Sequence, residues 1–370
     1  MTDTRLQIAV LFGGRSGEHE VSLMSARSVL DALDPQKYAI TQVGITRAGA
    51  WLTGENALDA LTAGETGGLQ PVTLLPDPTR RGLYRIVETP SGTRLERLTD
   101  VDVFIPVLHG TFGEDGTLQG LFEMAGAAYV GAGVVGSAAG MDKGVFKDVM
   151  RARGIPVVDG FVVTRREVQS GLDAVIRRAE DLGAYPFFTK PANLGSSVGV
   201  SKCKTRAELR AGLLEAARYD RRILVERGVN AREIEISVLG NDAPEASIPG
   251  EIRPAAEFYS YEAKYHDDRS ELFIPAPIPQ ETAEQLRATA VRAYRAIDCA
   301  GMARVDFLLD RATGDFYLNE VNTLPGFTQI SMYPKLWEAS GLPYPQLLDR
   351  LIAFAMERRR ERDALAVERL

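Results

Sequence analysis

The sequence predicts an α/β domain followed by α+β units, and three observations support this assignment. Short apolar runs near the start, such as residues 7–12, are each followed by a turn or by an apolar pattern of helical spacing. The middle of the chain mixes helical and strand patterns within a short length. Residues 303–326 hold two β-rich segments joined by a glycine-containing turn, as in a hairpin. We therefore expect an α/β sheet first and a hairpin-containing α+β region later.

The first third of the chain predicts a small parallel sheet. A strand at residues 7–12 precedes a helix at 20–33, and further buried runs occupy 38–45 and 101–108. Continuous apolar runs are typical of parallel strands, and the loops after such strands form binding sites. Two of these loops are unusual in composition: GGRSGEHEVS at 13–22 and HGTFGEDGTLQG at 109–120.

A second region begins where the pattern changes near residue 137. A helix at 144–153 ends at a Gly-Ile-Pro stop signal. A compact α+β unit follows, with strands on either side of the loop NLGSSVGVSK at 193–202 and helices at 167–182 and 206–218. The last region starts with an alternating strand and ends with an amphipathic helix at 347–356. The predicted domains are 1–137, 138–227 and 228–370.

Composition and charge exclude several classes of protein. The 370 residues are 45% hydrophobic, enough for two or three domains, and 43 basic against 50 acidic residues leave no basic stripe for nucleic acid. Cys203 and Cys299 are far apart and outside any CxxC spacing, which predicts reduced thiols without zinc or a disulfide.

The C-terminal segment ERRRERDALAVERL contains both basic and acidic residues, which favours a solvated helix end over a nucleic-acid or membrane tail. No run approaches the roughly 20 apolar residues that span a bilayer, so we expect a cytoplasmic protein.

The segment GAGVVG spells the GxGxxG of dinucleotide-binding oxidoreductases with Gly131, Gly133 and Gly136. That motif requires a strong strand before it and a position that opens a βαβ unit. Here the preceding AGAAYV is poorly patterned, and the motif lies near the end of a domain. We therefore expect these glycines to serve turns and close packing.

The predicted hairpin gathers polar side chains on one face. Arg304 and Asp306 share a face of the first strand, and Glu320 and Asn322 share a face of the second. If Asp306 lies opposite Glu320, two carboxylates and an amide oxygen come together, a ligand set suited to Mg²⁺ and not to zinc. The alternative is a solvated sheet face with ordinary salt bridges. The irregular loop at 322–326, which could present backbone donors to a substrate, favours a functional site.

Together these features predict ATP bound between two domains. The glycine-serine loop could wrap phosphate oxygens with backbone N–H groups, as phosphate-binding loops do, and Lys143 and Lys190 precede it. Seven segments then carry a family resemblance, in this order: LFGGRSGEHEVS, LHGTFGEDGTLQG, MDK, KPANLGSSVGVSK, YEAKY, ARVDF and NEVNTLPGFT. The chain resembles the ATP-grasp enzymes and, among them, the D-alanine–D-alanine ligase family, from about residue 7 to about residue 352.

The resemblance implies an ATP-grasp fold with an N-terminal Rossmann-like domain and a set of nucleotide contacts. Lys143 and Lys190 would contact the α- and β-phosphates, Glu226 would begin the hinge that binds adenine, and Glu233 would hold the ribose. Residues 195–199 would form a flexible cover, the flap, over the triphosphate. The remaining implied nucleotide contacts are Ser197, Phe258 and Leu308. Asp306, Glu320 and Asn322 would hold two Mg²⁺ ions, for which Mn²⁺ may substitute.

The resemblance also implies the reaction. One D-alanine carboxylate takes the γ-phosphoryl group of ATP, and the amine of a second D-alanine attacks the resulting acyl phosphate, in peptidoglycan precursor synthesis. Arg304 and the Gly326 N–H would stabilise the tetrahedral intermediate. Glu18 would pair with the first ammonium group and join Ser196 and Tyr265. Other implied substrate contacts are His109 and Lys264 and, for the carboxylate of the second D-alanine, Ser331 and Met332.

Several alternatives stay open. Glu18 could instead cap the glycine-rich turn, His109 could be a satisfied core residue, and Tyr265 could merely pack. By the resemblance, residues 258–273 would form a mobile lid, and Tyr265 favours D-alanine over D-lactate as the second substrate. Rival functions are another ATP-grasp carboxylate-amine ligase and a catalytically silent nucleotide sensor. A homodimer is expected from the frequency of twofold assemblies.

Overall fold

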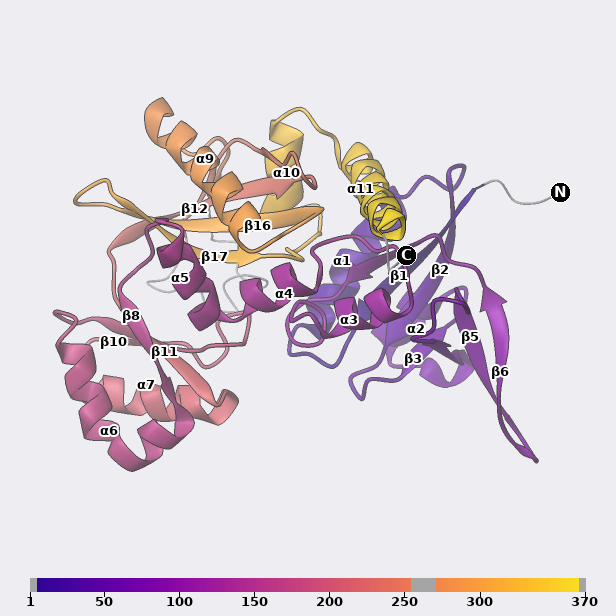
Figure 1. The fold of residues 1–370 in the computed structure, drawn as a ribbon, viewed down its shortest axis with the longest axis horizontal. Coiled ribbons are helices and arrows are strands. Elements are labelled where there is room, and N and C mark those ends of the chain that lie inside the picture. The colour runs from indigo at the N-terminus through magenta and orange to yellow at the C-terminus, as the bar shows by residue number, and fades with distance from the viewer. Residues whose placement is uncertain (1–4, 254–270, 366–370) are drawn as a thin grey trace.

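The computed structural model describes residues 5–253 and 271–365, and three sheets follow one another along the chain (Figure 1). The first is seven-stranded in the order β6-β5-β4-β3-β2-β1-β7. Its strands are β1 (Leu6–Gly13), β2 (Tyr38–Ile45), β3 (Trp51–Thr53), β4 (Gln70–Leu74), β5 (Leu83–Thr89), β6 (Gly92–Thr99) and β7 (Val103–Val107). Its helices are α1 (His19–Ala32), α2 (Ala57–Ala63), the short 3-10 helix η1 (Thr66–Gly68), α3 (Thr117–Met124) and α4 (Val134–Met141).

The parallel part of this sheet is as predicted, but the sheet as a whole is mixed. β1 pairs in parallel with β2 and β7, whereas β3 to β6 add antiparallel strands that the sequence did not predict. Strand β1 is buried on both faces because Val10 and Phe12 pack in one hydrophobic core with α1, and Ala9 and Leu11 pack in another with α3. Strand β6 is mostly exposed and has no such apolar run, so its sequence did not predict a strand.

The second sheet is antiparallel, in the order β10-β9-β11-β8. Its strands are β8 (Gly160–Thr164), β9 (Phe187–Pro191), β10 (Ser201–Cys203) and β11 (Arg222–Arg227), and its helices are α6 (Arg165–Glu180) and α7 (Arg206–Tyr219), preceded by α5 (Lys143–Ala152). A capping box of Thr164 and Glu167 begins α6 by satisfying two backbone donors. The apolar faces of α6 and α7 cover the sheet in a core of their own.

The third sheet has the order β15-β14-β12-β16-β17, with β13 paired to β12. Its strands are β12 (Ala231–Leu239), β13 (Glu245–Ala246), β14 (Gly250–Arg253), β15 (Glu271–Phe273), β16 (Met302–Asp310) and β17 (Phe316–Asn322); its helices are α9 (Gln280–Ala296), α10 (Met332–Ala339) and α11 (Tyr344–Ala364). The predicted hairpin is therefore present as β16 and β17.

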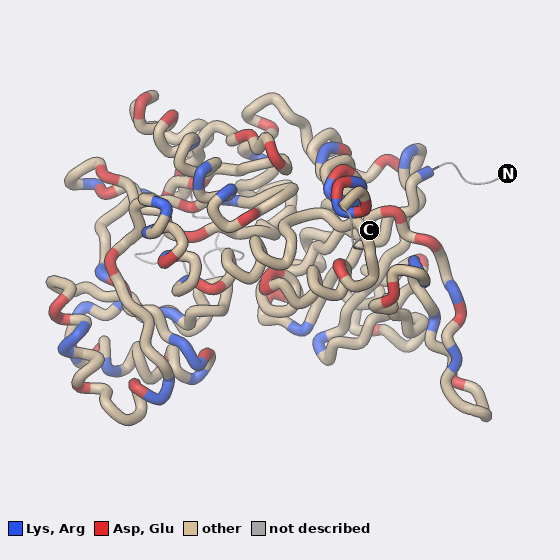
Figure 2. The backbone as a smooth tube through the Cα atoms, viewed as in Figure 1, with Lys and Arg blue, Asp and Glu red and all other residues tan. Residues whose placement is uncertain are grey.

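Helix α11 returns to the first sheet, where it lies beside α1 (Figure 1). Its residues Leu347 and Leu351 share a core with β1 and β7. Arg358 donates to the carbonyl of Gly131 at 2.5 Å, and Arg362 pairs with Glu123. The helix end is thus only partly solvated, and the prediction of a purely solvated end is wrong for these two arginines, although the mixture of charge signs along α11 is evident (Figure 2).

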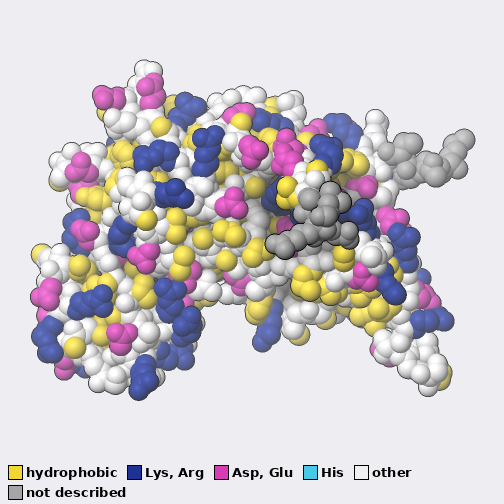
Figure 3. Space-filling view, in the orientation of Figure 1, with side chains coloured by type: hydrophobic (Ala, Val, Ile, Leu, Met, Phe, Trp, Pro, Cys, Tyr) yellow, Lys and Arg dark blue, Asp and Glu magenta, His cyan; other side chains and the backbone are white. Residues whose placement is uncertain are grey.

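The GxGxxG glycines serve packing. Gly131 has φ of +100°, and a Cβ there would lie 2.9 Å from Leu324 Cδ2; a Cβ on Gly136 would lie 3.0 Å from the carbonyl oxygen of Asp298. Both positions therefore require glycine for close approach. Cys203 and Cys299 are free and buried, and basic and acidic side chains are interspersed on the visible face (Figure 3). Within the described residues, no helix is both long and apolar enough to cross a membrane.

Candidate active site

The β16–β17 hairpin brings the predicted polar residues together. Asp306 lies directly opposite Glu320, and Arg304 lies opposite Asn322. The amide of Asn322 donates to Asp306 Oδ2 at 2.9 Å. Asp306 is buried, which excludes the alternative of a solvated sheet face at this position.

Arg304 is held between two carboxylates. Its Nε and Nη2 donate to Asp306 at 2.8 and 2.7 Å, and its Nε lies 3.0 Å from Glu235 Oε2. Burial alone would lower the pKa of Arg304, but the charges of Asp306 and Glu235 raise it, so the guanidinium stays charged. Glu235 on β12 faces Asp306 across the sheet. Glu235 was not predicted as a site residue, although the alternation REIEIS places it on the same face as Glu233.

Two lysines share one buried carboxylate on the second sheet. Glu226 Oε2 lies 2.8 Å from Lys190 Nζ, and Glu226 Oε1 lies 2.5 Å from Lys147 Nζ. Burial would raise the pKa of Glu226, but the two ammonium groups lower it to about 2. Lys147 is the more deeply buried of the two lysines and shares the Glu226 carboxylate with Lys190. Burial lowers the pKa of Lys147. Lys147 was not predicted; its spacing four residues after Lys143 on one helix face was the available signal.

Lys190 also interacts electrostatically with two carboxylates of the third sheet, Glu320 and Glu233. Burial would lower its pKa, yet the charges of Glu226, Glu320 and Glu233 raise it overall. Glu233 on β12 is paired in register with Leu308 on β16, so both predicted nucleotide contacts lie side by side. The faces of the second and third sheets that carry these residues are therefore close enough to interact.

Lys143 connects the start of the glycine-serine loop with the hairpin. Asp142 caps α5 by accepting from the N–H groups of Gly144 and Val145 at 3.0 Å, which fixes Lys143 at the first helical position. Lys143 Nζ donates to the Leu194 carbonyl at 2.8 Å and lies 3.8 Å from Glu320 Oε2. One lysine thus lies between the loop predicted to cover phosphates and the candidate metal ligands.

The flap reaches across to the N-terminal sheet. Ser196 and Ser197 have φ of +50° and +58°, which turns the backbone tightly. The Ser196 hydroxyl donates to Glu18 Oε1, and a Cβ on Gly195 would lie 3.0 Å from Glu18 Oε2. Glu18 occupies the N-cap position of α1, but its side chain makes no capping hydrogen bond. The carboxylate is therefore directed to the flap, and the capping alternative is wrong.

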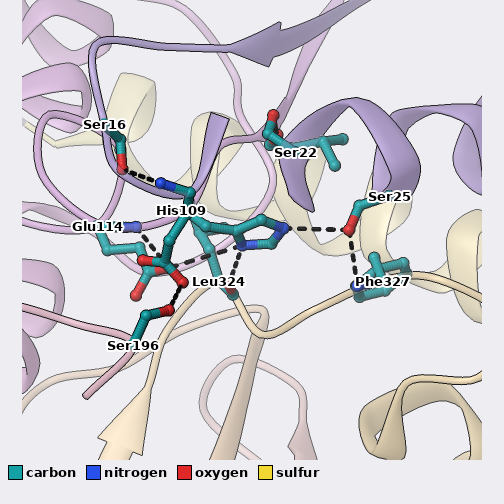
Figure 4. A network of polar contacts seen from close by, with 12 residues as sticks. Ser16, Ser22, Ser25, His109, Glu114, Ser196, Leu324 and Phe327 are labelled. Atoms are coloured by element: carbon teal, nitrogen blue, oxygen red, sulfur yellow. Dashed lines mark hydrogen bonds and ion pairs between the residues drawn. The ribbon is translucent and has the colours of Figure 1, made fainter. Parts of the chain in front are cut away.

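His109 is buried between the first sheet and the 324–327 loop (Figure 4). Its Nδ1 lies 3.0 Å from the Leu324 carbonyl, and its Nε2 lies 3.1 Å from Ser25 Oγ. Burial would lower the pKa of His109, but Glu114, at 3.7 Å, raises it above the ordinary value. Burial in turn raises the pKa of Glu114. His109 therefore has the contacts of a satisfied core histidine, the alternative that the sequence left open. The Glu114 carboxylate lies next to it.

The 324–332 segment places the remaining predicted substrate contacts. A Cβ on Gly326 would lie 3.1 Å from Ser331 Oγ, so glycine allows these two residues to approach. Ser331 Oγ accepts from the Thr328 N–H at 3.1 Å, and Met332 begins α10. The first N–H groups of a helix have no partner within the helix and favour anions. Phe258, Lys264 and Tyr265 lie outside the described residues.

The candidate metal ligands fit a hard cation. Among residues 5–253 and 271–365, no three His, Cys, Asp or Glu side chains form a group that could hold a metal ion. Asp306, Glu320 and Asn322 instead provide two carboxylates and one amide, an oxygen-only set that suits Mg²⁺ or Mn²⁺. Arg304 and Asn322 donate hydrogen bonds to the Asp306 carboxylate. A carboxylate has about four lone-pair sites, so these hydrogen bonds leave room for a metal ion.

The chain matches two sequence families over most of its length. Residues 7–132 match the family described as D-ala D-ala ligase N-terminus, and residues 149–353 match D-ala D-ala ligase C-terminus. A D-alanine–D-alanine ligase of Heliobacterium modesticaldum is 54% identical over 363 residues, 98% of each chain. One of Thermoanaerobacter pseudethanolicus is 52% identical over 359 residues, 96% of this chain and 98% of the relative.

Solved structures agree with this assignment. The D-alanine–D-alanine ligase of Coxiella burnetii is 38% identical with a TM-score of 0.82, covering 97% of this chain and 96% of that one. The VanG D-Ala:D-Ser ligase of Enterococcus faecalis is 34% identical with a TM-score of 0.84, covering 95% and 100%. The fold is thus the predicted ATP-grasp fold, and the chain belongs to the D-alanine–D-alanine ligase family.

Proposed function

We propose that this protein joins two D-alanine molecules in the cytoplasm through a D-alanyl phosphate, with conversion of ATP to ADP and phosphate. The observation that carries the ATP site is the position of Lys143, which contacts Glu320 and the carbonyl of Leu194, the residue before the flap. The naming of the similar ligases supports D-alanine as the acid and the amine. The alternatives are another ATP-grasp ligase of a different acid and amine, and a nucleotide sensor without activity.

ATP would lie between the second and third sheets. Lys143 and Lys190 act as point charges on the phosphates, and the flap covers them with Ser197 and its backbone N–H groups. Glu226 begins the adenine hinge, and Glu233 with Leu308 contacts the nucleoside. Glu226 is ionised because two lysines face it, so it also keeps Lys190 in a fixed position.

The first step is phosphorylation of the D-alanine carboxylate. Glu18 pairs with the substrate ammonium group, and Ser196 holds Glu18 in place. The carboxylate oxygen of D-alanine attacks the γ-phosphorus of ATP and ADP leaves, so a poor leaving group becomes a good one. Bound to Asp306, Glu320 and Asn322, Mg²⁺ ions would neutralise the negative charge that develops on the phosphoryl oxygens.

The second step is attack by the amine of the second D-alanine, whose carboxylate Ser331 and the Met332 N–H receive. The tetrahedral intermediate carries negative charge on oxygen, which Arg304 and the Gly326 N–H stabilise. One such donor contributes roughly 3–4 kcal/mol in other acyl-transfer sites. Arg304 is suited to this role because two carboxylates orient it before substrate arrives. As the intermediate collapses, the C–O bond to phosphate breaks, phosphate leaves, and the attacking nitrogen loses a proton to give the peptide.

Phosphate release tests the proposal and its alternatives together. We expect release with ATP and D-alanine, none with L-alanine, and D-alanyl-D-alanine as the product by mass spectrometry. D-Lactate and D-serine, offered as second substrates with D-alanine, test the depsipeptide alternative and the specificity named for the VanG relative. Release with another acid but not with D-alanine would contradict the proposal, and no release with any acid would favour the sensor. We also propose a homodimer, which light scattering tests.

A further inference from the structure

A second cavity lies at the carboxyl ends of β1, β2 and β7. It has a volume of about 360 Å³, within the range of small-molecule sites. Helix α3 forms one wall through Leu118 and Leu121, whereas Glu18 begins α1, which packs on the opposite face of the sheet. Of the described residues that line the cavity, none belongs to the flap, and Glu18 is not among them. The cavity nevertheless borders the substrate site: His109 adjoins both, and Ser16, which lines the cavity, accepts a hydrogen bond from the Glu18 N–H at 3.1 Å.

Arg15 is a cation at this cavity without an acidic partner. It follows the glycine turn after β1, is exposed, and forms no ion pair with any carboxylate that the structure describes. Its guanidinium carbon lies 5.8 Å from the centre of the Phe112 ring, within the range of a cation–π contact. Nearby Arg47, in contrast, is paired with Glu20. An always-charged, planar group without a partner is well suited to a carboxylate ligand.

Phe112 supports a binding role from a different observation. Phe112 lines the cavity, and half of its surface is exposed. Its φ is +65°, a backbone conformation that residues other than glycine rarely adopt. Backbone strain of this kind is held at ligand clamps more often than elsewhere. Three further large apolar side chains among those that line the cavity, Trp51, Leu118 and Leu121, can bury a ring-sized group.

We propose that this cavity binds a small organic carboxylate with an apolar, ring-sized body. The carboxylate lies on Arg15, and the body packs against Trp51, Leu118 and Leu121. Binding at this site needs neither ATP nor D-alanine. The 109–113 segment, which lines the cavity with Phe112, also carries His109, so a ligand there can influence the substrate site.

Calorimetry with 3-phenylpropanoate and its neutral amide tests the proposal on the full chain. We expect the acid to bind the wild type at millimolar concentration or tighter, and the amide about tenfold more weakly, because a charged hydrogen-bonded pair is lost. Arg15→Gln should remove this preference. Arg47→Gln makes the same change of charge at a paired arginine and should preserve it. Ala48→Trp, at an exposed position on the cavity wall, should weaken both ligands.

The contrary results are equally defined. No saturable binding of the acid, equal affinity for acid and amide, or an unchanged Arg15→Gln protein would each overturn the proposal. Binding that survives Ala48→Trp would place the ligand elsewhere. Displacement of the acid by D-alanine would assign it to the substrate site and would also overturn the proposal. Quenching of Trp51 in a Trp337→Phe protein, which has no other tryptophan, provides a second signal from the cavity itself.

Discussion

The polar residues of this protein form two kinds of cluster. Those around Arg304 and Glu226 are built mainly within single sheets, where strand register sets the distances between charges. The network around Glu18 and His109 instead joins segments as distant as 302 residues, the separation of Ser25 and Phe327. Side-chain hydroxyls, backbone carbonyls and the tight turn at Ser196 hold it together. The first kind is rigid because separating its members would require breaking a sheet. The second can open when one loop moves, so we expect mutations to affect catalysis or stability in the first and closure in the second.

Arg304→Ala should have the largest effect. Loss of one donor to the tetrahedral intermediate lowers kcat by about 100- to 1,000-fold, whereas KM for ATP changes little because Arg304 does not contact the phosphates in the proposed mechanism. Steady-state kinetics with both substrates measures the two constants. An unchanged kcat would remove Arg304 from this role.

A stability measurement must accompany this variant, because Asp306 and Glu235 lose their shared cation. Breaking a buried ion pair destabilises by about 3–5 kcal/mol. Arg304→Lys retains the charge without the planar guanidinium group. This variant should be more stable than Arg304→Ala, and its kcat should still be at least about tenfold below that of the wild type. Full activity of the lysine variant would show that charge alone is required.

Lys147→Met tests the Glu226 cluster through stability. Glu226 keeps Lys190 but loses the nearer cation, so the free energy of unfolding at pH 7 should fall by about 1.5–3 kcal/mol. The pKa of Glu226 is lowered from 4.5 to about 2, so its contribution is present above pH 4.5 and is lost as pH falls towards 2. Urea unfolding should therefore show a difference from wild type that shrinks across this window.

Lys143→Met is the matched control for that experiment. It makes the same change one helical turn earlier, where the lysine lies 3.8 Å from Glu320 and is partly exposed. We expect it to impair ATP binding and to alter stability by less than about 1 kcal/mol. An equal loss of stability in both variants, or a difference that does not depend on pH, would contradict the special role of the Glu226 cluster.

This contrast also explains what the sequence could predict. Alternation predicted that Arg304 and Asp306 share one face of their strand and Glu320 and Asn322 one face of theirs, because the period of a strand is fixed at two. That Asp306 lies opposite Glu320 was only a condition of the magnesium prediction, and the structure confirms it. Glu235 followed the same rule on a third strand but was overlooked, since nothing local shows that β12 lies beside β16. The contact of His109 with Leu324 depends on how distant segments pack, which no local pattern encodes. The pairing of Glu18 with Ser196 was predicted only through the family resemblance, not from spacing.

Ser196→Ala should weaken the closure of the flap. Glu18 loses a hydrogen bond to a charged group, so kcat/KM for D-alanine should fall about tenfold or more, with little change in KM for ATP. Hydrogen exchange of the amides at 195–200 should become faster because the flap is held less firmly. Ser197→Ala, one residue later, should instead raise KM for ATP. If the two variants had the same kinetic profile, the two serines would not have separate roles.

Glu114→Gln should have the smallest effect and tests the His109 network by pH. Burial lowers the pKa of His109, and Glu114 more than offsets this, so removing the carboxylate should lower the pH at which His109 titrates. A raised histidine pKa stabilises the fold fully below 6.5, and this contribution is lost as pH rises through the folded value. Because the chain has only three histidines, NMR resolves the His109 ring signal, which a His109→Asn variant identifies. If the titration of His109 did not move, Glu114 would not control its charge, and the network would depend on the Leu324 carbonyl and Ser25 alone.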